Sequence, residues 1–179
     1  MNPPTPSAPS AWVQRFHHAI RPGGTVLDLA AGGGRHTALL LAAGCAVVAA
    51  DRDGAGLAAF AAVPRCRIVV LDLEDGGPWR LGGGFDGIVV TNYLHRPLLP
   101  DLAAALAPGG VLIYETFMAG NERFGKPSNP DFLLRPDELL DAYRDRLGVM
   151  AFEQGIVAAP RLAAVQRLAA VKDGLVRLV

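Results

Sequence analysis

A stretch near the start of the chain, residues 26–37 with the sequence VLDLAAGGGRHT, decides how this protein folds. An apolar strand runs through two alanines into Gly32, Gly33 and Gly34, and the pattern predicts a helix over residues 35–43 directly afterwards. Because glycine lacks a Cβ atom, a ligand can lie close against the main chain of this loop. The first N–H groups of the helix have no partners within the helix and would point at that ligand. The stretch therefore predicts a strand–loop–helix unit that binds a nucleotide.

An acidic residue at the end of the next predicted strand supports that interpretation. The strand covers residues 46–50, and Asp51 follows it about 20 residues after the glycine loop begins, where nucleotide-binding α/β folds place the acid that binds ribose hydroxyls. Each feature alone has a structural alternative: the glycine cluster could form a tight turn that binds no ligand, and Asp51 could be a solvated acid at a strand end. Together the two features favour a nucleoside site.

The composition is that of one globular domain without a basic surface. With 179 residues, we expect a flexible proline-rich tail over residues 1–9 and a single domain over residues 10–179. The 17 basic side chains equal the 17 acidic ones, so the positive charge that usually accompanies nucleic-acid binding is missing. We expect no membrane segment and no signal peptide, hence a cytoplasmic protein. Cys45 and Cys66 lack metal-ligand spacing, so we expect free thiols and no metal site.

Apolar runs and helical patterns alternate along the chain, which is typical of a parallel sheet covered on both faces. The predicted helices cover residues 10–20, 35–43, 54–62, 98–107 and 136–145. The predicted strands cover residues 26–30, 46–50, 67–71, 85–91 and 111–116, followed by a closing β-hairpin over residues 149–157 and 163–172. Residues 117–135 form a long irregular stretch, and a loop of that length in a compact domain is usually functional or disordered.

With the closing hairpin, the pattern resembles the class I S-adenosylmethionine-dependent methyltransferases over about residues 10–173. The family's first motif, an acid followed by two or three glycines and a helix, is similar to residues 28–34, except that Ala30 stands where a glycine is usual. The resemblance implies an α/β, Rossmann-like sheet of seven strands. This sheet would be mostly parallel, with a C-terminal antiparallel hairpin and the strand order 3-2-1-4-5-7-6. It also implies S-adenosylmethionine as the cofactor.

The resemblance assigns roles to four of the expected cofactor contacts. Asp28 would organise the loop and face the methionine amino group, Asp51 would accept hydrogen bonds from both ribose hydroxyls, and Asp72 and Leu73 would bracket the adenine. Acids at strand ends are common in α/β sheets, so a purely structural role for Asp72 is an alternative. The full expected set of cofactor-binding residues is Asp28, Ala30, Gly32, Gly34, Asp51, Arg52, Asp72, Leu73 and Asn92.

A fourth motif, TNYLHRP over residues 91–97, follows the fourth predicted strand. In open α/β sheets ligands collect at the carboxyl ends of the strands, so Asn92, Tyr93 and His95 are the candidates for lining the methyl-transfer site. Tyr93 and His95 are the candidate catalytic residues, because an alcohol or amine acceptor would need a nearby base. Capping of the following helix is an alternative role for His95.

The small size and neutral charge favour a small-molecule acceptor, and the outline is similar to the tellurite and thiopurine methyltransferase groups. One alternative is a nucleic-acid methyltransferase with a phosphate-binding rim, and another is a non-catalytic S-adenosylmethionine-binding module. Residues 117–135 combine hinge glycines, aromatic residues and charges, which suggests a lid over the acceptor, although an ordered surface loop also fits. The basic residues available for a phosphate rim are Arg35, Arg52, Arg96, Arg123, Lys126 and Arg135.

Overall fold

The computed structural model describes residues 8–174, so most of the expected tail over residues 1–9 lies outside the described residues. One sheet of seven strands has the order β3-β2-β1-β4-β5-β7-β6, which confirms the predicted order. The pairs from β3 to β5 are parallel, whereas β7 is antiparallel to both β5 and β6. The strands are β1 Thr25–Leu29, β2 Ala46–Asp51, β3 Cys66–Val70, β4 Phe85–Thr91, β5 Leu106–Phe117, β6 Gly148–Val157 and β7 Ala163–Val171.

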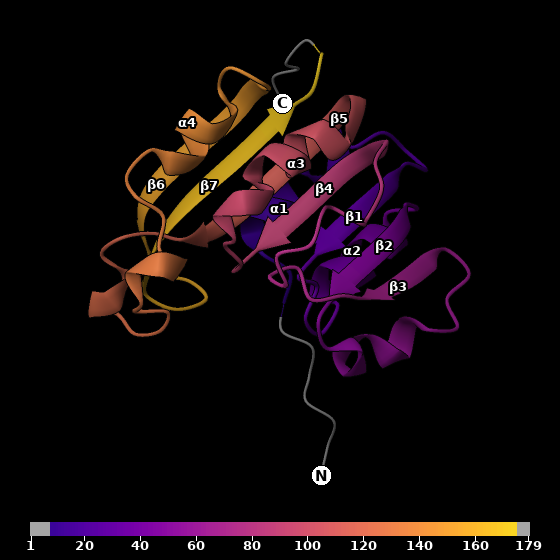
Figure 1. Ribbon diagram of the computed structural model, residues 1–179, viewed down its shortest axis with the longest axis horizontal. Helices are drawn as coiled ribbons and strands as arrows, with labels where there is room; N and C mark the ends of the chain where they lie inside the picture. Colours follow the sequence, from indigo (N-terminus) through magenta and orange to yellow (C-terminus); the bar gives the residue numbers. More distant parts are fainter. Residues whose placement is uncertain (1–7, 175–179) are drawn as a thin grey trace.

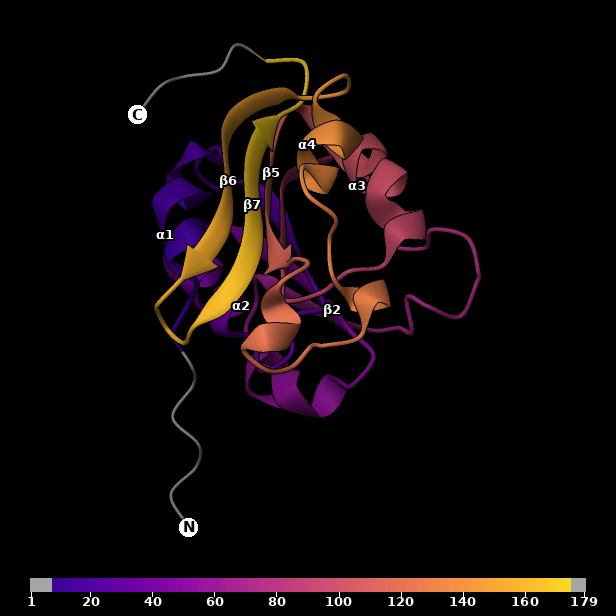
Figure 2. The ribbon, with the colours of Figure 1, turned by 90° about the vertical axis from the view of Figure 1, so that its left-hand side faces the viewer.

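Helices cover both faces of the sheet (Figure 1). Figure 2 shows α1 (Ala11–Phe16) and α2 (Arg35–Ala42) on one side, and α3 (Leu99–Ala105) and α4 (Glu138–Tyr143) on the other. Every residue of the central strand β4 is buried, because successive side chains enter the two opposite cores. This arrangement explains why the sequence shows unbroken apolar runs rather than alternation.

Parallel pairing places the carboxyl ends of β1, β2 and β4 at the same edge of the sheet. The glycine loop follows β1, Asp51 ends β2, and the motif over residues 91–97 begins at the end of β4. Segments that are far apart in the sequence therefore meet at this edge, where α/β sheets bind ligands.

Several element boundaries differ from the predicted ones. α1 ends at Phe16 and continues as a 3₁₀ turn over His17–Ala19, and the helix predicted over residues 54–62 is a 3₁₀ helix, η2, over Gly54–Phe60. β5 begins at Leu106 rather than at residue 111, and its pairing with β4 shifts in register between Phe85 and Gly87. This distortion requires Gly110, since a Cβ atom at that position would lie 2.6 Å from the Phe85 carbonyl oxygen.

Cys45 and Cys66 are free thiols, as predicted. No helix within residues 8–174 is both long enough and apolar enough to cross a membrane.

Candidate functional site

The glycine loop joins β1 to α2 through left-handed backbone positions. The φ angles are 54° at Ala30, 55° at Gly32 and 74° at Gly34. A left-handed conformation costs a non-glycine residue about 1–2 kcal/mol, so Ala30 keeps the backbone path typical of a glycine at moderate cost. A Cβ atom added to Gly32 or Gly33 would meet no atom within 4 Å. This side of the loop therefore has room for a ligand against the main chain.

Asp51 connects the end of β2 to the glycine loop. Its Oδ2 atom accepts a hydrogen bond from the Gly32 N–H at 2.7 Å, and its Oδ1 atom accepts one from the Asp53 N–H at 2.9 Å. A carboxylate has about four lone-pair sites, so the half-buried Asp51 can accept further hydrogen bonds from a ligand. The acid and the loop that the sequence analysis paired are thus in direct contact.

Three adjoining cavities follow this edge of the sheet. The β2–β3 cavity has a volume of about 300 Å³ and is lined by Ala30, Asp51, Arg52, Leu71, Asp72, Leu73, Glu74, Tyr93 and Phe132. The central cavity has a volume of about 210 Å³ and is lined by Glu74, Asn92, Tyr93, Leu94, Thr116, Phe117, Pro127 and Phe132. The β5–β7 cavity, of about 330 Å³, lies between the start of α1 and the carboxyl end of β5. Tyr93 lines the first two cavities, and Asn92 lines the last two.

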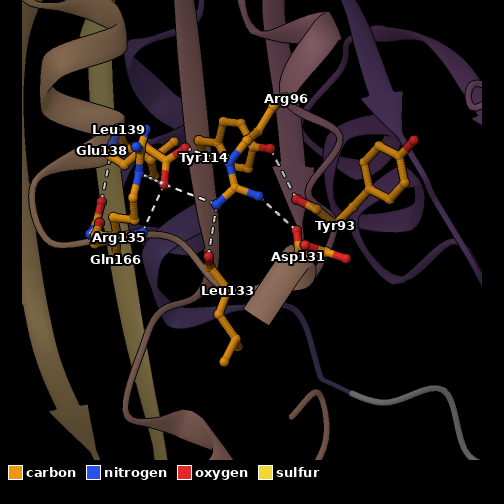
Figure 3. Close-up of polar contacts among 9 residues, drawn as sticks. All are labelled: Tyr93, Arg96, Tyr114, Asp131, Leu133, Arg135, Glu138, Leu139 and Gln166. Atoms are coloured by element: carbon orange, nitrogen blue, oxygen red, sulfur yellow. Dashed lines mark hydrogen bonds and ion pairs between the residues drawn. The ribbon is translucent and has the colours of Figure 1, made fainter. Parts of the chain in front are cut away.

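Tyr93 stands at the junction of the β2–β3 and central cavities. The Tyr114 hydroxyl donates a hydrogen bond to the Tyr93 carbonyl at 3.0 Å, while the Tyr93 ring extends away from Tyr114 (Figure 3). The Tyr93 hydroxyl is buried and has no hydrogen-bond partner within residues 8–174. Burial and the nearby negative charge of Glu74 raise the pKa of Tyr93 well above its ordinary value, so the phenol stays protonated at neutral pH. Tyr93 can therefore donate a hydrogen bond to a ligand but is a poor base.

Arg96 fastens the segment after β4 to the loop after β5 (Figure 3). Its guanidinium donates to the carbonyls of Asp131 and Leu133 at 2.7 and 2.8 Å and forms a two-point ion pair with Glu138 at 2.6 and 3.1 Å. Glu138 also accepts a hydrogen bond from the Arg135 N–H at 2.7 Å. Burial alone would raise the pKa of Glu138, but the hydrogen bonds from Arg96 and Arg135 outweigh burial and hold it below its ordinary value.

A buried polar network lies beneath the glycine loop. Asp28 accepts a hydrogen bond from the Thr37 hydroxyl at 2.6 Å, and burial raises the pKa of Asp28 to about 6. His36 Nε2 accepts a hydrogen bond from the Ser10 N–H at 3.0 Å, and burial lowers the pKa of His36 to about 4, so the ring is neutral. The ring proton is therefore assigned to Nδ1, which lies 3.3 Å from the Thr91 hydroxyl. His36 thus joins the start of α1 to the end of β4.

No protein-family model matches the sequence, and no curated protein matches it. Solved structures, in contrast, match the fold closely. TehB from Haemophilus influenzae has a TM-score of 0.75 at 18% identity; the match covers 94% of this chain and 63% of that chain, so this chain spans less than two thirds of it. The 1,6-didemethyltoxoflavin-N1-methyltransferase of Burkholderia thailandensis has a TM-score of 0.68 at 22% identity, covering 92% and 77%. A TehB-like SAM-dependent methyltransferase from Corynebacterium glutamicum has a TM-score of 0.65 at 21% identity, covering 90% and 86%. This chain has the class I methyltransferase fold.

Within this methyltransferase fold, most of the predicted cofactor residues gather around the β2–β3 cavity. Five of them line the cavity directly, and Gly32 lies beside it through its hydrogen bond to Asp51. The other three do not line it: Asn92 borders the central and β5–β7 cavities, Asp28 is buried beneath the loop, and Gly34 is a buried residue at the end of the loop itself. The five lining residues are Ala30, Asp51, Arg52, Asp72 and Leu73.

The two predicted catalytic residues are placed differently. Tyr93 lines two cavities, whereas His95 is absent from the lining of all three. His95 precedes the 3₁₀ turn Arg96–Leu98, but its side chain makes no capping hydrogen bond to that turn. His95 is therefore the N-cap residue of this turn, but it contributes its main-chain carbonyl, which accepts a hydrogen bond from the Leu98 N–H at 3.1 Å, and not its side chain.

The loop over residues 117–135 contributes directly to the site of the methyltransferase fold. It contains two 3₁₀ turns, Asn121–Arg123 and Pro130–Phe132, and Phe132 lines both the β2–β3 and the central cavities. The hydrogen bonds from Arg96 hold its second half against the segment after β4. The loop is thus an ordered wall of the two cavities, and whether it also opens and closes stays a prediction.

Two structural supports were not predicted from the sequence. Gly56 in η2 lies so close to the glycine loop that a Cβ atom there would be 2.5 Å from the Gly32 carbonyl oxygen. The small residues of η2 are the sequence signal for this close approach. The ion pair between Arg96 and Glu138 has no local signal, because its partners are 42 positions apart.

Asp28→Asn is expected to stabilise the fold at pH 7.5 by about 1–3 kcal/mol, because the pKa of Asp28 is raised from an ordinary 3.8 to about 6. At neutral pH the folded protein buries an ionised carboxylate, and this cost disappears as the pH falls from 6 to 3.8. The difference in unfolding free energy between the variant and the natural protein should therefore shrink over that window. Urea unfolding at a series of pH values measures it.

Asp86→Asn is the matched control on the same sheet. Burial alone would raise the pKa of Asp86, but hydrogen bonds from Arg21 and the Thr25 N–H outweigh burial and lower it. The control should therefore lose stability at pH 7.5. An Asp28→Asn protein that is destabilised throughout the pH range would contradict the proposed cost of burying Asp28.

Proposed function

We propose that this protein is an S-adenosylmethionine-dependent methyltransferase that acts on a small molecule. The observation that carries the proposal is the contact between Asp51 and the glycine loop at the mouth of the β2–β3 cavity. A carboxylate with free lone pairs lies there beside a backbone with open space above it, as a nucleoside with a ribose diol requires. Two solved structures that share the fold, the toxoflavin enzyme and the glycopeptide N-methyltransferase MtfA, hold S-adenosylhomocysteine, which supports the cofactor.

Different residues at the carboxyl edge of the sheet would bind the ribose, the adenine and the methionine portion of this cofactor. Asp51 would bind the ribose, and Asp72 and Leu73, in the same cavity, would bracket the adenine. Gly32 and Gly33 would let the methionine portion lie against the main chain, toward Asn92 at the end of β4. When bound, the cofactor would supply a methyl group on a positively charged sulfur.

The chain's own residues would mainly hold the acceptor in line with that methyl group, and positioning of this kind is worth up to about 7–11 kcal/mol in favourable cases. Tyr93 would donate a hydrogen bond from its unpaired hydroxyl rather than act as a base, because its phenol is protonated at neutral pH. Loop residues such as Phe132 would exclude water from the reacting atoms.

The basic residues weigh against a nucleic-acid substrate. Arg96 forms a close ion pair with Glu138, and Arg135 lies 3.4 Å from the same carboxylate, so an acid compensates part of the charge of this rim. The net charge is zero, and nucleic-acid affinity depends on many uncompensated cations. Methyl transfer from labelled cofactor is measured with small acceptors and with bulk RNA, and this comparison separates a small-molecule methyltransferase from a nucleic-acid methyltransferase. Absence of transfer to any acceptor would favour a binding module.

Asp51→Ala is expected to weaken S-adenosylmethionine binding at least tenfold, since each charged hydrogen bond lost costs about 1.5–3 kcal/mol. Calorimetric titration measures the dissociation constant, and circular dichroism confirms that the variant is folded. Asp53→Ala is the matched control, because Asp53 is the neighbouring exposed acid and its side chain caps η2. Equal affinities for Asp51→Ala and the natural protein would remove Asp51 from the cofactor site.

His95→Ala is expected to lower turnover less than tenfold and to leave cofactor affinity unchanged, because His95 lies outside the three cavities. Loss of a general base would instead lower turnover by about 10²–10⁴-fold. Steady-state kinetics with the acceptor found in the screen distinguishes the two cases. A large drop in turnover at unchanged cofactor affinity would restore His95 as the base.

A further inference from the structure

The β5–β7 cavity has a chemical character of its own. It shares Asn92 with the central cavity, and its volume of about 330 Å³ is within the range of small-molecule sites. Its walls come from the start of α1, the end of β5 and the turn between β6 and β7. The apolar part of the wall consists of Phe117, Val157, Pro160, Ala163 and Val165.

Cations outnumber acids around this cavity. Arg35, Arg161 and Arg167 line it, and Glu115 is the only acid among its lining residues. Arg167 Nε lies 2.5 Å from Glu115 Oε2, and both side chains are largely buried, so this pair cancels its own charge. Two arginines therefore remain without a carboxylate partner in the cavity wall.

Two contacts orient the Arg161 side chain so that it could bind an anion. Its guanidinium lies over the ring of Phe117, 5.1 Å from the centroid, and one N–H donates to the Lys126 carbonyl at 2.7 Å. Arginine has five N–H donors in a planar fork, so the stacked group retains donors for a bidentate contact. Stacking and the carbonyl contact restrict the side chain before any ligand arrives, which reduces the entropy that binding must overcome.

We propose that the β5–β7 cavity binds the methyl acceptor as a small organic carboxylate with an apolar body. A nitrogen, oxygen or sulfur atom at the end of the body nearest Asn92 would take the methyl group, and S-adenosylhomocysteine would leave. The carboxylate would lie at Arg161 and Arg35, and the body would lie against Phe117 and Val165 toward Asn92. An inorganic oxyanion would leave most of the apolar wall uncovered, whereas a neutral apolar molecule would make no charged hydrogen bond to the two arginines. This inference rests on the proposed function, because Asn92 also borders the central cavity where the methyl group would lie.

Matched pairs of acid and amide test this inference. Benzoate, cinnamate and octanoate, each beside its primary amide, are titrated into the protein saturated with S-adenosylhomocysteine, and binding is followed by ligand-observed NMR and calorimetry. We expect at least one acid to bind at least tenfold more tightly than its amide. The difference should fall severalfold in Arg161→Gln. Arg123→Gln, which removes one positive charge outside the cavity, should keep the difference.

The outcomes separate this inference from the proposed function. Equal binding of acids and amides, or an acid preference that survives Arg161→Gln, would overturn the carboxylate site. Binding of S-adenosylhomocysteine without binding of any acid would also overturn it while leaving the methyltransferase proposal in place. Acid binding that depends on Arg161 in a protein that does not bind S-adenosylhomocysteine would support the carboxylate site and overturn the methyltransferase proposal.

Discussion

Gly33→Val is expected to weaken S-adenosylmethionine binding at least about a hundredfold, or roughly 2.7 kcal/mol, without unfolding the protein. A Cβ atom at Gly33 meets no protein atom within 4 Å, and Gly33 does not have a positive φ angle, so the folded chain can accommodate a side chain there. The same branched side chain would fill the space where the ligand must approach the main chain. Calorimetric titration measures the affinity, and thermal unfolding confirms the fold.

Gly34→Ala is the matched comparison, because we expect it to lower the stability of the fold rather than block the ligand. Gly34 has a φ of 74°, and a Cβ atom there would clash with the ring of Phe60. This variant should lose stability whether or not a ligand is present. Natural affinity in a folded Gly33→Val protein would show that the ligand does not approach the glycine loop.

Glu138→Gln is expected to destabilise the protein by about 2–3 kcal/mol. Breaking a buried ion pair costs about 3–5 kcal/mol, and 35% exposure of the Arg96 side chain reduces that figure. The pKa of Glu138 is held below its ordinary 4.5, so the difference from the natural protein should be full above that pH and shrink as the pH falls below it. Urea unfolding at pH 7 and at lower pH measures both effects.

Asp141→Asn on the same helix is the matched control. Asp141 pairs with Arg144 one turn away, but both side chains are more than half exposed, so the loss should stay below about 0.5 kcal/mol. Arg96 also holds the loop after β5, so limited proteolysis should cut that loop faster in Glu138→Gln than in the control. Equal stabilities of the two variants would contradict a structural role for the Arg96–Glu138 pair.

The features that the sequence predicted well depend on local pattern. Apolar runs located β1, β2 and β4, and the glycines located the loop, because backbone freedom and burial leave a direct trace in residue type. The strand order came from the resemblance to a family. The strand order is not encoded by any single segment, because it depends on pairs such as β5 and β7 that are far apart in the sequence.

The features that the sequence did not predict depend on tertiary contacts. η2 is a 3₁₀ helix that packs against the Gly32 carbonyl, so the packing of the loop outweighs the helical pattern of residues 54–62. His36 is one polar residue in a short helix, and nothing around it indicates that Ser10 and Thr91 are its partners. The position of His95 outside the cavities depends on how the chain turns after Asn92, which has a φ of 55°.

The position of β7 sets the order in which a newly made chain can fold. β7 is the last strand in residues 8–174, yet it lies between β5 and β6 (Figure 1). While the ribosome is still making residues 163–171, β5 has one open edge and β6 has no neighbour to pair with. The Trp12 indole also lacks its hydrogen-bond partner during this time, because it donates to the Leu168 carbonyl in the folded protein. Nascent chains therefore expose an unpaired strand edge until residues 163–171 have been made, and during that interval aggregation and chaperone binding compete with closure of the sheet.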